Sequence, residues 1–84
     1  MTFRPITHWN YRIIEHEEDE ERVFTMHEVY YDDEGPHSWT AKPVTPTAGS
    51  RDEMILVLEG MLQDAKTKPV LRIENETGLV EIPG

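Results

Sequence analysis

Hydrophobic and polar residues alternate in the first half of the chain in a pattern that predicts three consecutive strands. Residues 9–15 (WNYRIIE) and 22–31 (RVFTMHEVYY) are rich in aromatic and β-branched side chains and follow a period of two. Residues 37–41 (HSWTA) predict a shorter third strand, which stops before Pro43 because proline cannot donate to a ladder. The acidic segments EEDEE and DDEGP lie between the runs and predict turns, so the strands form an antiparallel meander.

The hydrophobic period changes to that of a helix after residue 50. Ser50 and Glu53 fit a capping box, in which each side chain bonds to the backbone of the other. Apolar residues then recur at helical spacing and define one face: Met54, Ile55, Leu58, Met61, Leu62 and Ala65. Pro69 cannot continue a helix, and residues 70–74 (VLRIE) predict a fourth strand beyond it. Residues 79–82 (LVEI) form a fifth strand or fray.

Together these elements predict an α+β fold of order β-β-β-α-β. It is a two-layer fold, in which the helix covers one face of a sheet made of the three-stranded meander and the fourth strand. Residues 1–84 are expected to form a single domain with an ordered core over about 9–74. A sheet with one uncovered face and an open edge favours self-association, so we expect a homodimer formed through that face or edge.

Two resemblances accompany this pattern. The order of the elements, the acidic first hairpin and the capped helix opening SRDEMILVLEGML resemble the HicB-antitoxin-like fold group over about residues 9–74. This resemblance implies the β-β-β-α-β architecture and an antitoxin-like or regulatory role. Residues 27–32 (HEVYYD) and 39–44 (WTAKPV) are similar to small bacterial proteins of no assigned function, which implies no particular activity.

Composition narrows the functional classes. The chain has 84 residues and no cysteine, which removes disulfides, thiolate metal sites and cysteine nucleophiles. The first residues, MTFRPITHWNYR, lack the apolar run of a signal peptide, and no stretch is long enough to span a membrane. We therefore expect a cytoplasmic protein. A chain of this size buries only roughly 60–65% of its unfolded surface, which disfavours an enclosed active site.

The negative charge is concentrated in one segment. Residues 15–34 hold ten carboxylates and one cation, which accounts for the whole net charge of −9. Such a charge repels nucleic acid and instead favours a basic protein partner. The residues expected to form this acidic partner surface are Glu17, Glu18, Asp19, Glu20, Asp32, Asp33 and Glu34. The leading hypothesis is thus a small acidic interaction module without catalysis and without a cofactor.

The same segment suggests a metal site, but its spacing does not favour one. The predicted second strand separates the two acidic turns by about 30 Å, so one ion cannot be bound by both. The calcium-loop pattern and the helical zinc motif are also absent. We predict no metal site in the acidic turns, which are interpreted as solvated ends of the hairpins.

His27 and Glu28 are the remaining candidates for chemistry. Alternation, with Ile13 paired to Phe24, places Glu28 on the face toward the helix, where an unpaired carboxylate is costly. A β-bulge at residues 27–28, or a bond from Arg12 or Lys42, would relieve this conflict. The alternative hypothesis is a divalent-cation or small-ligand site around His27 and Glu28 at a dimer interface. The candidate binding residues are His27, Glu28, Tyr30 and Trp39.

Nucleophilic catalysis has little support in the sequence. His37 is adjacent to Ser38, but neighbours on a regular strand point to opposite faces and cannot form a dyad. We therefore predict that the protein is not an enzyme.

Overall fold

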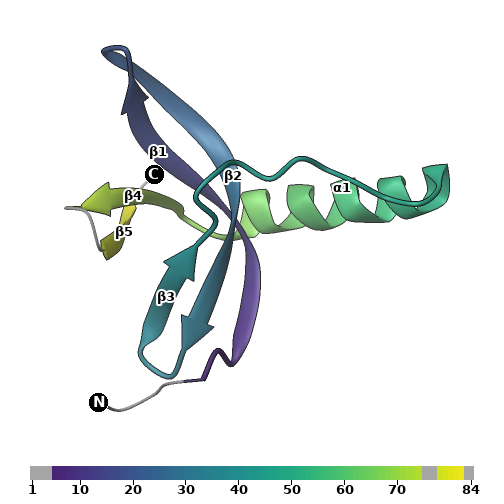
Figure 1. Ribbon diagram of the computed structural model, residues 1–84, viewed down its shortest axis with the longest axis horizontal. Coiled ribbons are helices and arrows are strands. Elements are labelled where there is room, and N and C mark those ends of the chain that lie inside the picture. The colour runs from purple at the N-terminus through teal and green to yellow at the C-terminus, as the bar shows by residue number, and fades with distance from the viewer. Residues whose placement is uncertain (1–4, 75–77, 83–84) are drawn as a thin grey trace.

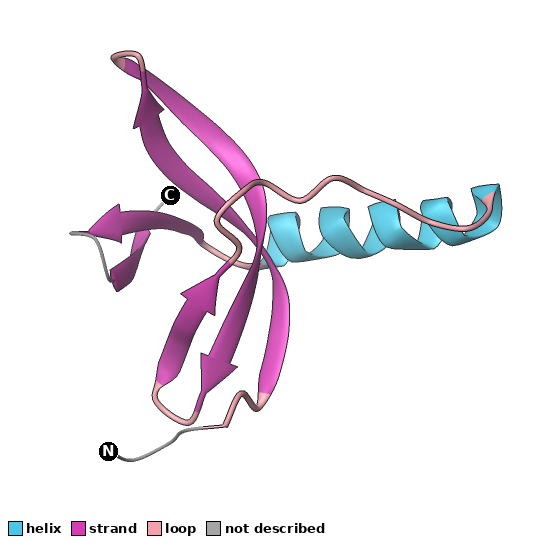
Figure 2. Cartoon of the chain, viewed as in Figure 1, coloured by secondary structure: helices cyan, strands magenta, loops and turns pink. Residues whose placement is uncertain are grey.

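The computed structural model describes residues 5–74 and 78–82. In this part of the chain there are five strands and one helix (Figure 1). Their bounds are β1 (His8–Glu18), β2 (Glu21–Asp32), β3 (Gly35–Trp39), α1 (Arg51–Thr67), β4 (Val70–Glu74) and β5 (Gly78–Ile82). Residues 40–50 lead from the end of β3 to the far end of the helix (Figure 2).

The strands form one mixed sheet in the order β3-β2-β1-β4-β5. β2 is antiparallel to both β1 and β3, as expected of a meander, and β5 is antiparallel to β4. β4, however, joins the sheet beside β1 and runs parallel to it, with Leu71 opposite Ile14. The predicted β-β-β-α-β fold is therefore wrong, because the sheet is mixed, with β4 parallel to β1, and carries a fifth strand, β5, at its edge.

The helix does not form a second layer over the sheet. It projects away from the sheet, and its C-terminal end is the part attached to β1 (Figure 1). Within α1, whose residues are all described, only Met61 is buried. The predicted layer fails because most of the helix has no strand beneath it.

A small core lies on one face of the curled sheet. Ile14, Val29 and Leu71 are fully buried, and Tyr31 is almost so. Trp39 and Leu79 pack against this cluster from the outer strands. This is the face that carries His27, whereas alternation was expected to place Phe24 and Glu28 inward.

The first turn explains why the predicted pairing was displaced. Asp19 and Glu20 both have positive φ, of 50° and 67°, and they form a two-residue hairpin turn. The strands therefore extend through Glu18 and Glu21, which pair with each other. Ile13 consequently lies opposite Met26, two residues further along β2 than predicted.

Candidate functional site

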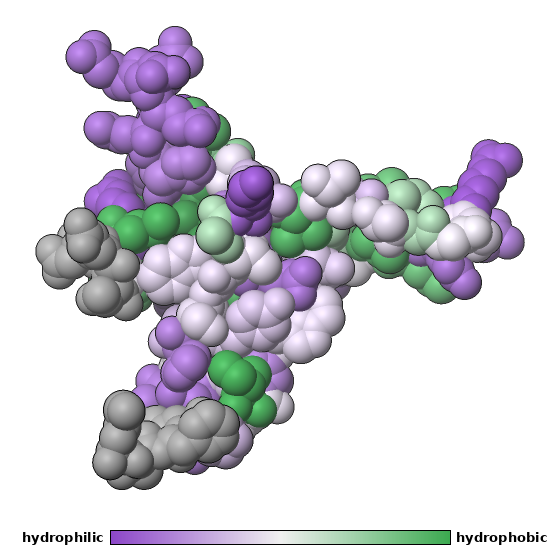
Figure 3. Space-filling view, in the orientation of Figure 1, coloured by the Kyte–Doolittle hydropathy of each residue, from purple (hydrophilic) through white to green (hydrophobic). Residues whose placement is uncertain are grey.

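The hairpin of β1 and β2 ends in a row of exposed carboxylates, which we call the acidic tip: Glu17, Glu18, Asp19, Glu20 and Glu21. β4 pairs with β1 only at Ile14 and Glu15, and β3 pairs with β2 only from Val29 onward. The tip therefore extends beyond the neighbouring strands. It forms the hydrophilic arm at the upper left of Figure 3.

Two arginines at the base of the acidic tip bind one buried carboxylate. Glu15 is 7% exposed. Its Oε1 forms an ion pair with Arg22 Nε at 2.7 Å, and its Oε2 forms another with Arg72 Nη2 at 3.3 Å. Among the described residues, no basic side chain is paired with the five carboxylates of the tip. The charge of the tip is therefore not neutralised within the described chain.

The second acidic group lies at the other end of β2. Asp32 Oδ1 accepts a hydrogen bond from the Glu34 backbone N–H at 2.8 Å, which stabilises the turn before β3. β2 has twelve residues, so at about 3.3 Å per residue its two ends lie roughly 40 Å apart. The seven residues predicted for the acidic partner surface therefore lie in two groups at opposite ends of β2, as the length of the predicted strand indicated.

His27 is buried and uses both ring nitrogens. Its exposed fraction is 6%. Nδ1 lies 2.9 Å from the Thr40 carbonyl oxygen, and Nε2 lies 2.8 Å from Thr25 Oγ1. The same hydroxyl lies 2.9 Å from Nε2 of His16, so the four residues form a continuous chain of hydrogen bonds.

The direction of these hydrogen bonds follows from the Thr40 carbonyl oxygen, which can only accept. A carbonyl oxygen only accepts, so Nδ1 of His27 carries the hydrogen that Thr40 receives. In the neutral ring Nε2 then accepts from the Thr25 hydroxyl, whose oxygen is left to accept from Nε2 of His16. His27 therefore has no ring nitrogen left for a ligand.

Glu28 lies on the opposite face of β2 from His27. Its Oε1 accepts a hydrogen bond from the Tyr30 hydroxyl at 2.8 Å, and this bond, with a smaller effect of burial, raises the pKa of Tyr30. The pairing of β1 with β2 is regular at residues 27–28, so the expected bulge is not there. The expected bond from Arg12 or Lys42 is replaced by the bond from Tyr30.

The four candidate binding residues are therefore not brought together. His27 and Trp39 lie on the side of the core, and Glu28 and Tyr30 lie on the other side. A single ligand cannot contact both pairs without crossing the sheet.

The β-bulge occurs instead between β2 and β3. Tyr30 pairs with Ser38, but Tyr31 pairs with Pro36, so His37 is the additional residue. The break in alternation brings His37 Nδ1 to 3.2 Å from Ser38 Oγ. The prediction that these side chains point apart is therefore wrong, and their contact is exposed to solvent.

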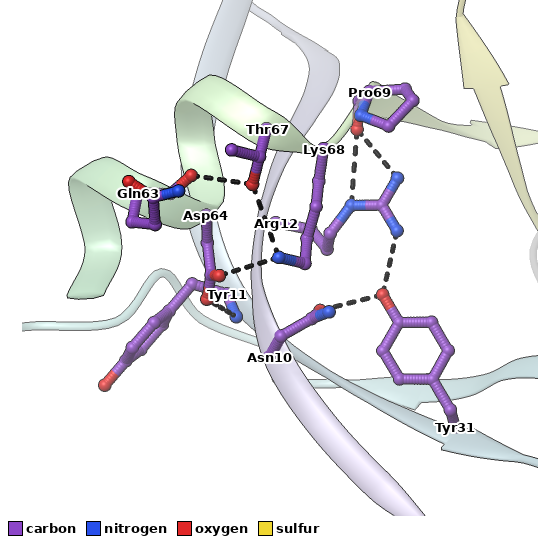
Figure 4. A network of polar contacts seen from close by, with 9 residues as sticks. All are labelled: Asn10, Tyr11, Arg12, Tyr31, Gln63, Asp64, Thr67, Lys68 and Pro69. Carbon is purple, nitrogen blue, oxygen red and sulfur yellow. Dashed lines mark hydrogen bonds and ion pairs between the residues drawn. The ribbon is translucent and has the colours of Figure 1, made fainter.

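A polar network around Arg12 was missed by the sequence interpretation (Figure 4). Arg12 is 5% exposed, and its Nε and Nη2 both donate to the Pro69 carbonyl, at 3.2 and 2.8 Å. Its Nη1 donates to the Tyr31 hydroxyl at 2.8 Å, and that hydroxyl donates to Asn10 Oδ1. An arginine within an otherwise aromatic and aliphatic strand was the available indication.

Asp64 forms the neighbouring part of the same region (Figure 4). Its carboxylate accepts from the Tyr11 backbone N–H at 3.1 Å and from Lys68 Nζ at 2.8 Å. Burial raises the pKa of Asp64, but the bonds from Lys68 and Tyr11 outweigh burial and hold that pKa below its ordinary value. Both networks attach the helix end to the sheet and are structural.

An open groove of about 510 Å³ lies where the helix meets the sheet. Its lining includes Phe24, Ala65, Lys66, Val70 and Ile82. No three side chains of His, Asp or Glu within the described residues are grouped to hold a metal ion. In the same part of the chain, no helix has the length and apolar character needed to cross a membrane.

Comparisons with protein-family models, curated proteins and solved structures returned no match. The resemblance to the HicB-antitoxin-like group is therefore untested.

Proposed function

We propose that this protein is a non-catalytic interaction module of the cytoplasm whose acidic tip binds a basic surface of a protein partner. The observation that carries the proposal is the row of five consecutive exposed carboxylates on a hairpin that extends past β3 and β4. A paired hairpin holds these charges in place before binding, which reduces the ordering cost of association.

Electrostatics favours this surface for rapid and selective encounter. Clustered charge of one sign speeds association with a complementary surface and repels partners of like charge. Because Arg22 and Arg72 are bound to Glu15, they do not neutralise the tip. A role as a regulator or antitoxin-like partner agrees with such a surface and stays a prediction.

The alternative of a divalent-cation or small-ligand site at His27 and Glu28 receives no support from the geometry. The two side chains lie on opposite faces of β2, and both nitrogens of His27 are already bonded within the protein.

A capture experiment with two matched variants tests the proposal. The immobilised protein is used to capture partners from a lysate of its source cells, with bound proteins identified by mass spectrometry. The first variant neutralises Glu17, Glu18 and Glu20 as glutamines, and the control changes Asp32→Asn, Asp33→Asn and Glu34→Gln. Both remove three charges, but only the first removes them from the tip.

We expect the tip variant to lose the partner and the control to keep it. Capture by the unmodified protein should also fall as salt rises from ~0.05 to ~0.5 M, since screening weakens exposed charge pairs. Capture that survives both high salt and the tip substitutions would contradict the proposal.

A further inference from the structure

The projecting helix presents an uncovered apolar stripe. Ile55, Leu58 and Leu62 recur at intervals of three and four residues, which places them in one line along α1. Their exposed fractions are 44%, 47% and 59%. Ala65 extends this line toward the sheet. We call these four residues the helix seam, and their spacing is that of the a and d positions of a coiled coil.

In the described part of the chain, the hydrogen bond from the sheet to the helix lies near the C-terminal end of α1. A helix of 17 residues is marginal in water by itself, and helices in proteins draw most of their stability from packing an apolar face. In α1 the bond from Tyr11 to Asp64 fixes the last turns, whereas the first turn is held by its own cap at Ser50. The exposed seam runs along the part that projects.

We propose that the helix seam is the interface of a homodimer in which α1 pairs antiparallel with α1 of a second copy. Pairing about the middle of the helix places Leu58 opposite the partner's Leu62. It also places Ile55, a large side chain, opposite the partner's Ala65, a small one. This interface is distinct from the sheet face and sheet edge that the sequence suggested for a dimer.

The charges beside the seam select a second copy in this orientation. Asp52, Glu59 and Lys66 are spaced by seven residues and flank the seam on one side. An antiparallel pair places Asp52 beside the partner's Lys66 at both ends. A parallel pair would instead place Glu59 and Lys66 beside the partner's Met54 and Met61, on the other flank of the seam, and would form neither ion pair. Glu59 faces the partner's Glu59 at the two-fold axis, the one unfavourable pair in this row.

The groove at the base of the helix continues the seam. Ala65 and Lys66 line it together with Phe24, which is 56% exposed. A helix of 17 residues is about 25 Å long, so the first turns of the partner helix reach this groove. The apolar side chain of the partner's Ile55 and the charge of the partner's Asp52 match the groove's alanine and lysine. Figure 3 shows hydrophobic surface along the projecting helix.

Solution mass tests the interface. We expect light scattering at micromolar concentrations to give the mass of a dimer for the full chain. Leu58→Ser combined with Leu62→Ser should give the monomer mass. Leu56→Ser is the matched control, because Leu56 is 68% exposed but lies outside the seam; it should keep the dimer. A monomeric unmodified chain, or a dimer that survives the double substitution, would overturn the proposal.

Cysteine cross-linking tests the orientation without relying on a destabilised variant. The chain has no cysteine of its own. Glu59→Cys should cross-link to itself under mild oxidation, because residue 59 meets its copy at the two-fold axis. Asp52→Cys should not, since the two copies of residue 52 lie about 20 Å apart along the antiparallel pair, beyond the reach of a disulfide. Self-cross-linking of Asp52→Cys would place the two N-terminal helix ends together and overturn the proposal.

The dimer and the proposed partner binding can fail separately. The acidic tip is not part of the helix seam, so its glutamine variant should keep the dimer mass. The seam variant Leu58→Ser with Leu62→Ser should in turn keep the charge of the tip.

Discussion

The carboxylate of Asp64, near the end of α1, accepts a hydrogen bond from the backbone N–H of Tyr11 in β1 at 3.1 Å. Arg12, the residue after Tyr11, donates two hydrogen bonds to the carbonyl of Pro69, which lies just before β4. These contacts join segments more than fifty residues apart in the sequence. They hold the helix end against β1 and place β4 beside it.

Replacing Asp64 should therefore weaken the whole fold. We expect Asp64→Ala to lower the free energy of unfolding by about 1–3 kcal/mol, because it leaves the Tyr11 N–H without its acceptor. Asp64→Asn keeps an acceptor oxygen and loses mainly the ion pair with Lys68, which is worth about 1 kcal/mol or less. Urea denaturation measures both variants. Equal losses for the two would show that the bond to Tyr11 contributes nothing measurable.

The same carboxylate predicts a pH dependence. The pKa of Asp64 is lower in the folded protein than its ordinary value of 3.8. Its contribution to stability is thus complete above the ordinary pKa and is lost as the pH falls through the lower, folded value. The difference in unfolding free energy between the unmodified protein and Asp64→Asn should be constant above about pH 5 and shrink below about pH 4. A difference that grew on acidification would contradict this sign.

Local elements followed from the sequence because their causes are local. The Ser50 hydroxyl accepts from the Glu53 N–H at 3.1 Å, as the capping box predicted, although the Glu53 side chain accepts from Gly49 rather than Ser50. The helix ends at Thr67, before Pro69. The strand order had no local cause, because it depends on contacts such as that of Arg12 with Pro69.

Of the candidate site, only the features with a local cause were predicted from the sequence. The length of β2 was enough to predict that the two acidic turns lie far apart. The register of β1 with β2 was set by two residues, Asp19 and Glu20, in a left-handed conformation that glutamate rarely adopts. A longer turn was the natural expectation, and it moved the pairing by two residues. A shift of two residues keeps the same side chains together on each face of β2. The error was in the choice of the inward face, because Ile14 rather than Ile13 is fully buried, and Ile14 lies opposite Thr25 on the side of His27.

His27 should be important for stability even with no ligand present. We expect His27→Ala to lower the unfolding free energy by about 2–3 kcal/mol, since it removes a buried ring and a hydrogen-bond partner of Thr25 and Thr40. The exposed His37 is the control, and His37→Ala should change stability by about 0.5 kcal/mol or less. Nitrogen NMR should find the hydrogen of the neutral His27 ring on Nδ1. A hydrogen on Nε2 would contradict the assigned direction of the chain.

The first hairpin should become more stable with glycine at residue 20. Glu20 has a φ of 67°, and a left-handed conformation costs about 1–2 kcal/mol for residues other than glycine. Glu20→Gly also creates the Asp-Gly pair favoured in two-residue hairpin turns. We expect a gain of about 1 kcal/mol by thermal or urea unfolding. Glu21→Gly, placed in a regular strand, should lose about 0.5–1 kcal/mol instead; a gain of equal size there would show that conformation is not the cause.

Gly60 in the middle of α1 has no structural requirement for glycine in the single chain. A Cβ added at this position would meet nothing within 4 Å, and glycine inside a helix costs about 1 kcal/mol relative to alanine. Gly60→Ala should therefore stabilise the protein by about that amount. Gly35→Ala is the opposite case, because the φ of Gly35 is +122° and an added side chain is strained there. Gly60 also lies on the side of α1 away from the helix seam, so Gly60→Ala should raise the unfolding temperature without changing the mass in solution. A loss of the dimer in this variant would mean that the two copies contact each other on the face of Gly60. A lower unfolding temperature would mean that the space beside Gly60 is filled.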